Sequence, residues 1–163
     1  MASGDSLIMF QPWSFSPPAT NAATIGHRNN HPVLNFDTTT QWTAYFSGIL
    51  PRAYGSSGVT VYVHWMAATA TSGTIGWDIA FERMSDNTTD LDSDSFATAQ
   101  TVTAATVPST AGVVKVTSVA ITNGANMDSV NVGDSFRLRI RRDVANDTAA
   151  GFAQLLAIEI KET

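Results

Sequence analysis

Acidic side chains are concentrated in one short stretch of the sequence, DNTTDLDSDS at residues 86–95, which contains no Lys or Arg. Oxygen-rich stretches of this kind are typical of Ca²⁺ sites. The spacing of Asp90, Asp92 and Asp94 matches the opening of an EF-hand loop, but the glycine and the later glutamate that an EF-hand requires are missing. We therefore expect a solvated surface loop. A less regular structural calcium site, completed by Asn87 or backbone carbonyls, stays open as the alternative.

A second candidate for chemistry is the pair of carboxylates Asp78 and Glu82, which share one face of a predicted strand. Acid–base hydrolysis of a glycosidic bond needs two carboxylates about 5 to 9.5 Å apart. Four residues of extended chain separate these two by roughly 13 Å, which is too far for this pair alone. A partner carboxylate on a neighbouring strand would restore the spacing, so a glycosidase remains an alternative. With no G-x-S-x-G elbow and no phosphate-binding loop in the sequence, we expect no enzyme.

Three histidines and no cysteine are available as soft metal ligands. His27 and His31 have a spacing that would suit a helix, but Pro32 follows directly and the surroundings indicate a loop. His64 lies on the outward face of a predicted strand and has no second histidine beside it. We predict no metal centre and no cofactor.

The charge balance limits the partners. The chain has 14 acidic residues against 9 Lys and Arg, a formal charge of -5, so binding to nucleic acid has no electrostatic basis. Charged residues make up 14% of the chain, well below the roughly 25% of ordinary soluble domains. A surface this neutral suits a protein that packs against neighbours. No basic leader and no apolar run of about 18 residues is present, so we expect folding in the cytoplasm and no membrane partner.

The elements that position these residues are predicted to be strands, because apolar residues recur with a period of two. The clearest case is FRLRIRRD, where Phe136, Leu138 and Ile140 share one face and the intervening arginines share the other. About eight such strands are expected, at 33–36, 42–50, 59–66, 75–83, 100–107, 113–121, 136–142 and 152–160. Turn-forming clusters separate them. The pattern predicts an all-β fold, a two-sheet antiparallel sandwich of jelly-roll type, with a meandering barrel as the alternative.

The basic residues are concentrated on one predicted strand, as Arg137, Arg139, Arg141 and Arg142. They form either a docking face for an acidic surface or a solvated face paired with carboxylates of adjacent strands. The candidate carboxylates for such pairs are Asp78, Glu82 and Glu159.

Residues 1–30 differ from the rest, because they contain three prolines together with three aromatic residues that need to be buried. We predict an extended N-terminal arm over 1–30 and a jelly-roll domain over 31–163. The arm either lies over its own sandwich or clasps a neighbouring subunit. The residues that it would bury are Met9, Phe10, Trp13 and Phe15.

Aromatic residues of the predicted strands divide into two groups. Trp42, Trp65 and Trp77 fall on the apolar phase and are expected in the core, which leaves three tyrosines to stack on a sugar. These are Tyr45, Tyr54 and Tyr62.

Four segments carry a resemblance to a known family: AYFSGILPRAY (44–54), GVTVYVHWMAATATSGTIGWDIAFER (58–83), DSDSFATAQTVT (92–103) and GDSFRLRIRRD (133–143). Over about residues 30–161 the chain resembles a family of jelly-roll structural proteins of tailed bacteriophages. The resemblance implies a β-sandwich on the virion, commonly trimeric, that decorates and cements the head or belongs to the tail. It carries over no catalytic residue.

We therefore expect a non-enzymatic virion structural protein, most simply a capsid decoration (cement) protein that forms a homotrimer and contacts the major capsid protein or tail proteins. A tail or receptor-binding module that recognises host glycan is the alternative. Trimer contacts would bury the less polar strand faces, including Ala80, and the acidic loop would meet the arginine row of a neighbouring subunit. The candidate inter-subunit contacts are Met9, Phe10, Trp13, Phe15, Tyr62, Met66, Arg137, Arg139 and Arg141.

Overall fold

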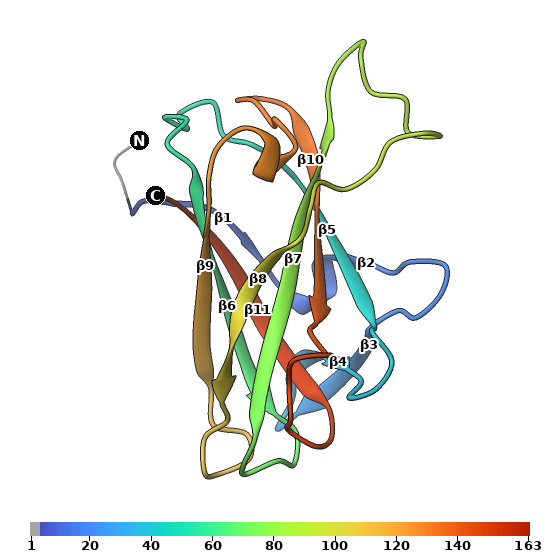
Figure 1. Ribbon diagram of the computed structural model, residues 1–163, viewed down its shortest axis with the longest axis vertical. Helices are drawn as coiled ribbons and strands as arrows, with labels where there is room; N and C mark the ends of the chain where they lie inside the picture. Colours follow the sequence, from blue (N-terminus) through green and yellow to red (C-terminus); the bar gives the residue numbers. More distant parts are fainter. Residues whose placement is uncertain (1–3) are drawn as a thin grey trace.

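The protein is a sandwich of two antiparallel β-sheets around one apolar core (Figure 1). The structure is a computed structural model that describes residues 4–163. The predicted all-β, two-sheet sandwich of jelly-roll type is confirmed, and each of the eight predicted strands is present within two residues of its expected ends.

The first sheet has six strands, with β11 and β6 at its centre. Strand β1 pairs with the C-terminal half of β11, while β4 pairs with its N-terminal half. In order, the path is β3 (Thr24–Arg28), β4 (His31–Phe36), β11 (Ala153–Glu162), β6 (Val59–Ala67) and β9 (Lys115–Ile121), with β1 (Ser6–Phe10) beside β11.

The second sheet has five strands, with β10 between β5 and β7. In order they are β2 (Phe15–Ser16), β5 (Thr43–Ile49), β10 (Ser135–Arg142), β7 (Thr74–Met84) and β8 (Gln100–Thr106). Two short 3-10 turns, η1 (Pro12–Ser14) and η2 (Ala125–Met127), complete the described structure. Among residues 4–163 there is no helix of the length and apolarity that crossing a membrane requires.

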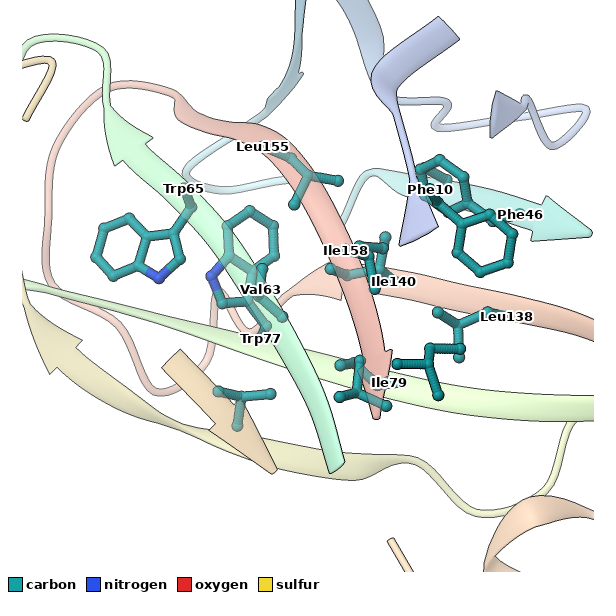
Figure 2. Packing of buried hydrophobic residues seen from close by; sticks show 14 of the residues in the cluster. Phe10, Phe46, Val63, Trp65, Trp77, Ile79, Leu138, Ile140, Leu155 and Ile158 are labelled. Carbon is teal, nitrogen blue, oxygen red and sulfur yellow. The ribbon is translucent and has the colours of Figure 1, made fainter. Parts of the chain in front are cut away.

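Residues 4–30 are part of the sandwich and not a separate arm, while residues 1–3 of the predicted arm lie outside the described residues. Strand β1 pairs with β11, and the β3–β4 hairpin crosses the boundary predicted at residue 30. Phe10, 6% exposed, lies between the sheets and stacks on Phe46 with 5.3 Å between ring centroids (Figure 2). Of the two interpretations of this segment, the structure has the one in which it lies on its own sandwich.

The core follows from the two-residue period of the strands, because every second side chain points between the sheets. Trp65 of β6 and Trp77 of β7 are fully buried and lie next to each other, 6.5 Å between centroids (Figure 2). Trp42 is only half-buried, which corrects the expectation that it belongs to the core. It precedes β5 and packs on the ring of Phe152 at the edge of the sandwich.

Two more residues lie deeper than expected. Arg142 shares the inward face of β10 with Ile140 and is fully buried, so it does not belong to the outward arginine row. Tyr54 was a candidate for sugar stacking, but it is buried in the core. Its hydroxyl accepts a hydrogen bond from the N–H of Gly58 at 2.9 Å and fixes the turn before β6.

The connection between β7 and β8, residues 85–99, is the longest loop, and its first part projects from one end of the sandwich (Figure 1). Its last part returns to the sheet, where the N–H of Ala97 donates to the carbonyl of Phe81 at 2.8 Å. The loop therefore reaches the outer face of the five-stranded sheet.

Candidate binding face on the five-stranded sheet

The outer face of the five-stranded sheet brings most of the predicted polar residues together. The strand register places Arg139 between Tyr45 and Ala80, with Arg137 in the next row and Arg141 in the row on the other side. We call this surface the arginine face and define it by Tyr45, Asp78, Glu82, Phe96, Arg137, Arg139 and Arg141. It holds three guanidinium groups, two carboxylates and two aromatic rings.

Arg137 and Glu82 form a two-pronged ion pair across β10 and β7. Nη2 of Arg137 donates to Oε1 of Glu82 at 2.8 Å, and Nε donates to the other carboxylate oxygen. Glu82 is only 2% exposed. The hydrogen bond that Arg137 donates to Glu82 raises the pKa of Arg137, against the opposing effect of burial. The expected pairing of the arginine row with Glu82 is therefore confirmed.

Arg141 and Asp78 form a looser pair. Nη2 of Arg141 lies 3.8 Å from Oδ2 of Asp78, while the hydroxyl of Thr101 donates to Oδ1 at 3.2 Å. Burial raises the pKa of Asp78, and the charge of Asp143 raises it further, against the hydrogen bond and the guanidinium. Asp78 thus neutralises Arg141 less completely than Glu82 neutralises Arg137. The third expected partner, Glu159, is on the other sheet and lies 3.9 Å from Lys161 instead.

Arg139 has no carboxylate partner among the described residues. Its Nε is buried without a hydrogen-bond partner, as is Nε of Arg141. Burial and the neighbouring charge of Arg141 lower the pKa of Arg139. Its Cζ lies 4.8 Å from the centre of the Phe96 ring, so the two side chains form a cation–π pair. The centre of the arginine face is therefore a cation that lacks a hydrogen-bond acceptor.

Phe96 joins the long loop to this cation, and the sequence-based prediction did not identify it as a site residue. Its ring stacks on Tyr45 with 5.4 Å between centroids and 19° between planes. Cζ of Arg137 lies 5.0 Å from the Tyr45 ring and 5.3 Å from the Phe96 ring. The signal that could have found Phe96 is its position as the single aromatic residue between an acidic loop and the next strand.

The acidic loop turns on the backbone carbonyl of Asp90, which accepts hydrogen bonds from the N–H groups of Ser93 and Asp94. Asp94 is the member nearest to the arginine face, and its charge is the smallest of the effects that raise the pKa of Arg137. Asp94 thus lies close enough to the arginine row of its own chain for its charge to act on Arg137, without an ion pair between them in residues 4–163. No group of three or more His, Asp or Glu side chains in residues 4–163 is arranged to hold a metal ion.

The remaining predicted contact residues lie elsewhere. Met9 and Trp13 are 62% and 61% exposed, and Trp13 packs on His27 with 5.7 Å between ring centroids. Tyr62 is half-buried on the outer face of the six-stranded sheet, under the ammonium group of Lys161. The predicted contact residues are therefore divided between the two outer faces of the sandwich.

Three of the proposed contact residues are largely covered by their own chain. Phe10 belongs to the core, Phe15 is half-buried against it, and Met66 is 4% exposed at the floor of a hollow of about 470 Å³. Arg28 and His31 line the same hollow. Ala80 is also fully buried, although its side chain points to the outer face. Phe10, Met66 and Ala80 thus offer almost no surface to another subunit, which corrects the expectation for them.

The chain is similar to known proteins in its structure, and no similarity in sequence accompanies it. No protein-family model and no curated sequence matches the chain. The CBM22-2 xylan-binding domain from Paenibacillus barcinonensis Xyn10C superimposes with a TM-score of 0.52 at 12% identity, covering 92% of both chains. The CBM22-1 domain of the same protein gives 0.51 at 15% identity, covering 99% of this chain and 96% of that one. The xylan-binding module CBM15 gives 0.51 at 9% identity, with 96% and 97% covered. At these identities the likeness establishes the sandwich fold alone.

Proposed function

We propose that this chain is a glycan-binding β-sandwich module whose ligand binds on the arginine face. The observation that carries the proposal is the presence, on one sheet face, of the Tyr45–Phe96 ring pair beside two buried guanidinium Nε groups that lack acceptors. Sugars offer what such a surface lacks, since their hydroxyls accept hydrogen bonds and their C–H faces pack on aromatic rings.

The geometry supports binding more than catalysis. Asp78 and Glu82, the carboxylates of this face, are each engaged by an arginine of β10. They stand two rows apart on the same strand, a separation of roughly 13 Å along the chain, beyond the range that glycoside hydrolysis uses. A binding module needs no such pair. Solved structures with a similar fold include xylan-binding modules, which supports the same proposal by analogy of fold.

Binding to a glycan array followed by calorimetry of the strongest ligand tests this function. Tyr45→Ala and Phe96→Ala remove the two rings of the arginine face, and each should weaken binding about 5-fold or more, since ring stacking contributes roughly 1 kcal/mol. Tyr62→Ala, on the opposite sheet, is the matched control and should leave the affinity unchanged. Equal losses for Tyr45→Ala and Tyr62→Ala, or no binding to any glycan, would reject the proposal.

A virion structural role is the second candidate, and a different surface favours it. Strand β9 is an edge strand, and Val114 and Val116 at this edge are about half exposed, near the hollow over Met66. Exposed apolar residues at a strand edge suit contact with other subunits. A homotrimer that cements a phage head would use this edge and would be present in hundreds of copies per virion. The number of copies per virion, compared with that of the major capsid protein, tests this role. A near-equal number supports a location on the head, and only a few copies per virion would reject it.

A further inference from the structure

We propose that the ligand of the arginine face is an acidic glycan, and that Arg139 together with Arg141 binds the carboxylate of one of its uronic-acid units. This inference rests on the proposed function and specifies its substrate class. The two arginines are two residues apart on β10, so they share the outward face.

The charges of the face leave room for one anion. Glu82 is held by both prongs of Arg137, and Asp78 makes a single long contact with Arg141. The side chain of Arg139 makes no ion pair or hydrogen bond in the described chain, although it is partly buried. Three guanidinium groups therefore stand over two carboxylates on this face, and the charges of Asp94 and Asp143 act on its Arg137 and Asp78 from outside it. The excess of positive charge is thus confined to Arg139, whose side chain has no carboxylate contact in residues 4–163. In a chain with a formal net charge of -5, an anion should favour this position over the rest of the surface.

The unpaired donors determine the shape of that anion. Nε of Arg139 and Nε of Arg141 are both buried without an acceptor, whereas buried donors in folded proteins nearly always have one. Because the Nε atoms are covered by the chain itself, a ligand meets each guanidinium at its Nη groups, whose paired N–H donors match the two oxygens of a planar carboxylate. Neutral sugars supply hydroxyls but no such fork. A carboxylate is therefore the acceptor that fits this pair of donors best.

The aromatic rings place the rest of the sugar. Phe96 lies 4.8 Å from Cζ of Arg139, and Tyr45 stacks on Phe96. A uronic acid whose carboxylate meets Arg139 has its ring carbons beside these two aromatic groups. The same residues that fasten the long loop thus form the wall of the acidic-sugar site.

The test measures binding of the full chain to glucuronic-acid-bearing xylo-oligosaccharides and to the same oligosaccharides after carboxyl reduction, by calorimetry. We expect the intact form to bind at least 10-fold more tightly than the reduced form, and the preference to shrink as salt is raised from about 50 to 300 mM. In Arg139→Gln the preference should fall to about 3-fold or less, because only Arg141, already in contact with Asp78, remains to meet the carboxylate. Arg139→Lys keeps the charge without the fork and should retain part of the preference. Lys161→Gln, on the other sheet, is the control and should keep the preference whole.

The outcomes separate the two proposals. Equal binding of intact and reduced oligosaccharides by the unmodified chain overturns the acidic specificity and leaves glycan binding standing. A 10-fold preference that Arg139→Gln does not change overturns the assignment to Arg139. Tighter binding of a sulfated than of a carboxylated oligosaccharide overturns the carboxylate assignment. Absence of binding to every neutral and acidic glycan overturns both proposals.

Discussion

Arg142 and Asp147 form an ion pair that is almost completely removed from water. Nε of Arg142 donates to Oδ2 of Asp147 at 2.5 Å, and the side chains are 0% and 4% exposed. The remaining donors of the guanidinium reach the carbonyls of Ala149 and Gly151, each at 2.6 Å. One buried side chain thus satisfies a carboxylate and two backbone carbonyls of the loop that joins β10 to β11.

Loss of this guanidinium should destabilise the fold strongly. Arg142→Met leaves the Asp147 carboxylate and two carbonyls without donors in the interior, and we expect a loss of about 3 to 5 kcal/mol in the free energy of unfolding. Urea denaturation followed by tryptophan fluorescence measures it. Arg141→Met, one position away on the outward face, is the matched control and should cost under about 1 kcal/mol. A similar loss for both variants would contradict the structural role assigned to Arg142.

The buried indole N–H of Trp65 gives a second test of how much a hydrogen bond to a buried polar group stabilises the fold. Its Nε1 donates to the hydroxyl of Thr117 on the neighbouring strand β9 at 2.9 Å, while the side chain is fully buried. Thr117→Val keeps the shape and β propensity but removes the acceptor, which should cost about 1 to 3 kcal/mol in unfolding free energy. Thr117→Ser keeps the acceptor and should recover most of the loss. If Ser and Val are equally destabilising, the hydroxyl is not what stabilises this site.

Asp37 gives a prediction for pH. Its carboxylate accepts a hydrogen bond from the N–H of Thr40 at 2.9 Å, the main cause that lowers the pKa of Asp37 from 3.8 to about 2, against a smaller opposing effect of burial. The folded-state pKa is below the unfolded one, so the carboxylate stabilises the fold above pH 3.8 and this contribution is lost as the pH falls toward 2. Because water reaches the group, we expect under about 1 kcal/mol.

Asp37→Asn should therefore lower the unfolding free energy at pH 6 and have little effect near pH 2. An NMR titration of the Asp37 carboxyl checks the pKa directly. Thr39→Ala removes only the minor hydroxyl contact to the same carboxylate, at 3.0 Å. It should raise the pKa of Asp37 only slightly, because the hydrogen bond from the N–H of Thr40 remains. A titration midpoint near 3.8 would show that the turn does not hold the anion.

The strands were predictable because burial on one face imposes a period of two on the apolar residues. All eight predicted strands are present in the two sheets. The same rule already distinguished Arg142 from its neighbours, since 142 is in phase with Phe136, Leu138 and Ile140. Grouping it with the outward arginines ignored that phase. Residues 4–30 were misjudged because prolines mask the pattern: β1 and β3 are five residues each, and β1 pairs with the distant strand β11 while β3 forms a hairpin with β4.

The candidate site was only partly predictable. The arginine row and its carboxylates follow from adjacent strands in register, so the pairs with Glu82 and Asp78 could be expected. The placement of Phe96 could not, because it depends on how a loop of the 85–99 connection folds back, and loops carry no periodicity. The buried state of Tyr54 likewise depends on a turn hydrogen bond to Gly58.

Phe96 should control the mobility of the long loop. Its ring packs on Tyr45 and lies about 5 Å from the guanidinium groups of Arg137 and Arg139, contacts that together contribute roughly 1 to 2 kcal/mol. Phe96→Ala should therefore raise the hydrogen-exchange rate of the Ala97 amide, which donates to Phe81, by about 5- to 30-fold.

The comparison with a second aromatic pair makes this test specific. Phe152→Ala removes the partner of Trp42, a stack of similar size at 5.7 Å, and should leave the exchange of Ala97 unchanged because it lies outside the arginine face. Slow exchange of Ala97 in Phe96→Ala would mean that the loop is held by its backbone contacts alone. In that case the Phe96 ring would contact the ligand without holding the loop, and its loss would weaken glycan binding while the mobility of the loop stays the same. Faster exchange together with weaker binding would mean that the ring both orders the loop and forms the wall of the site.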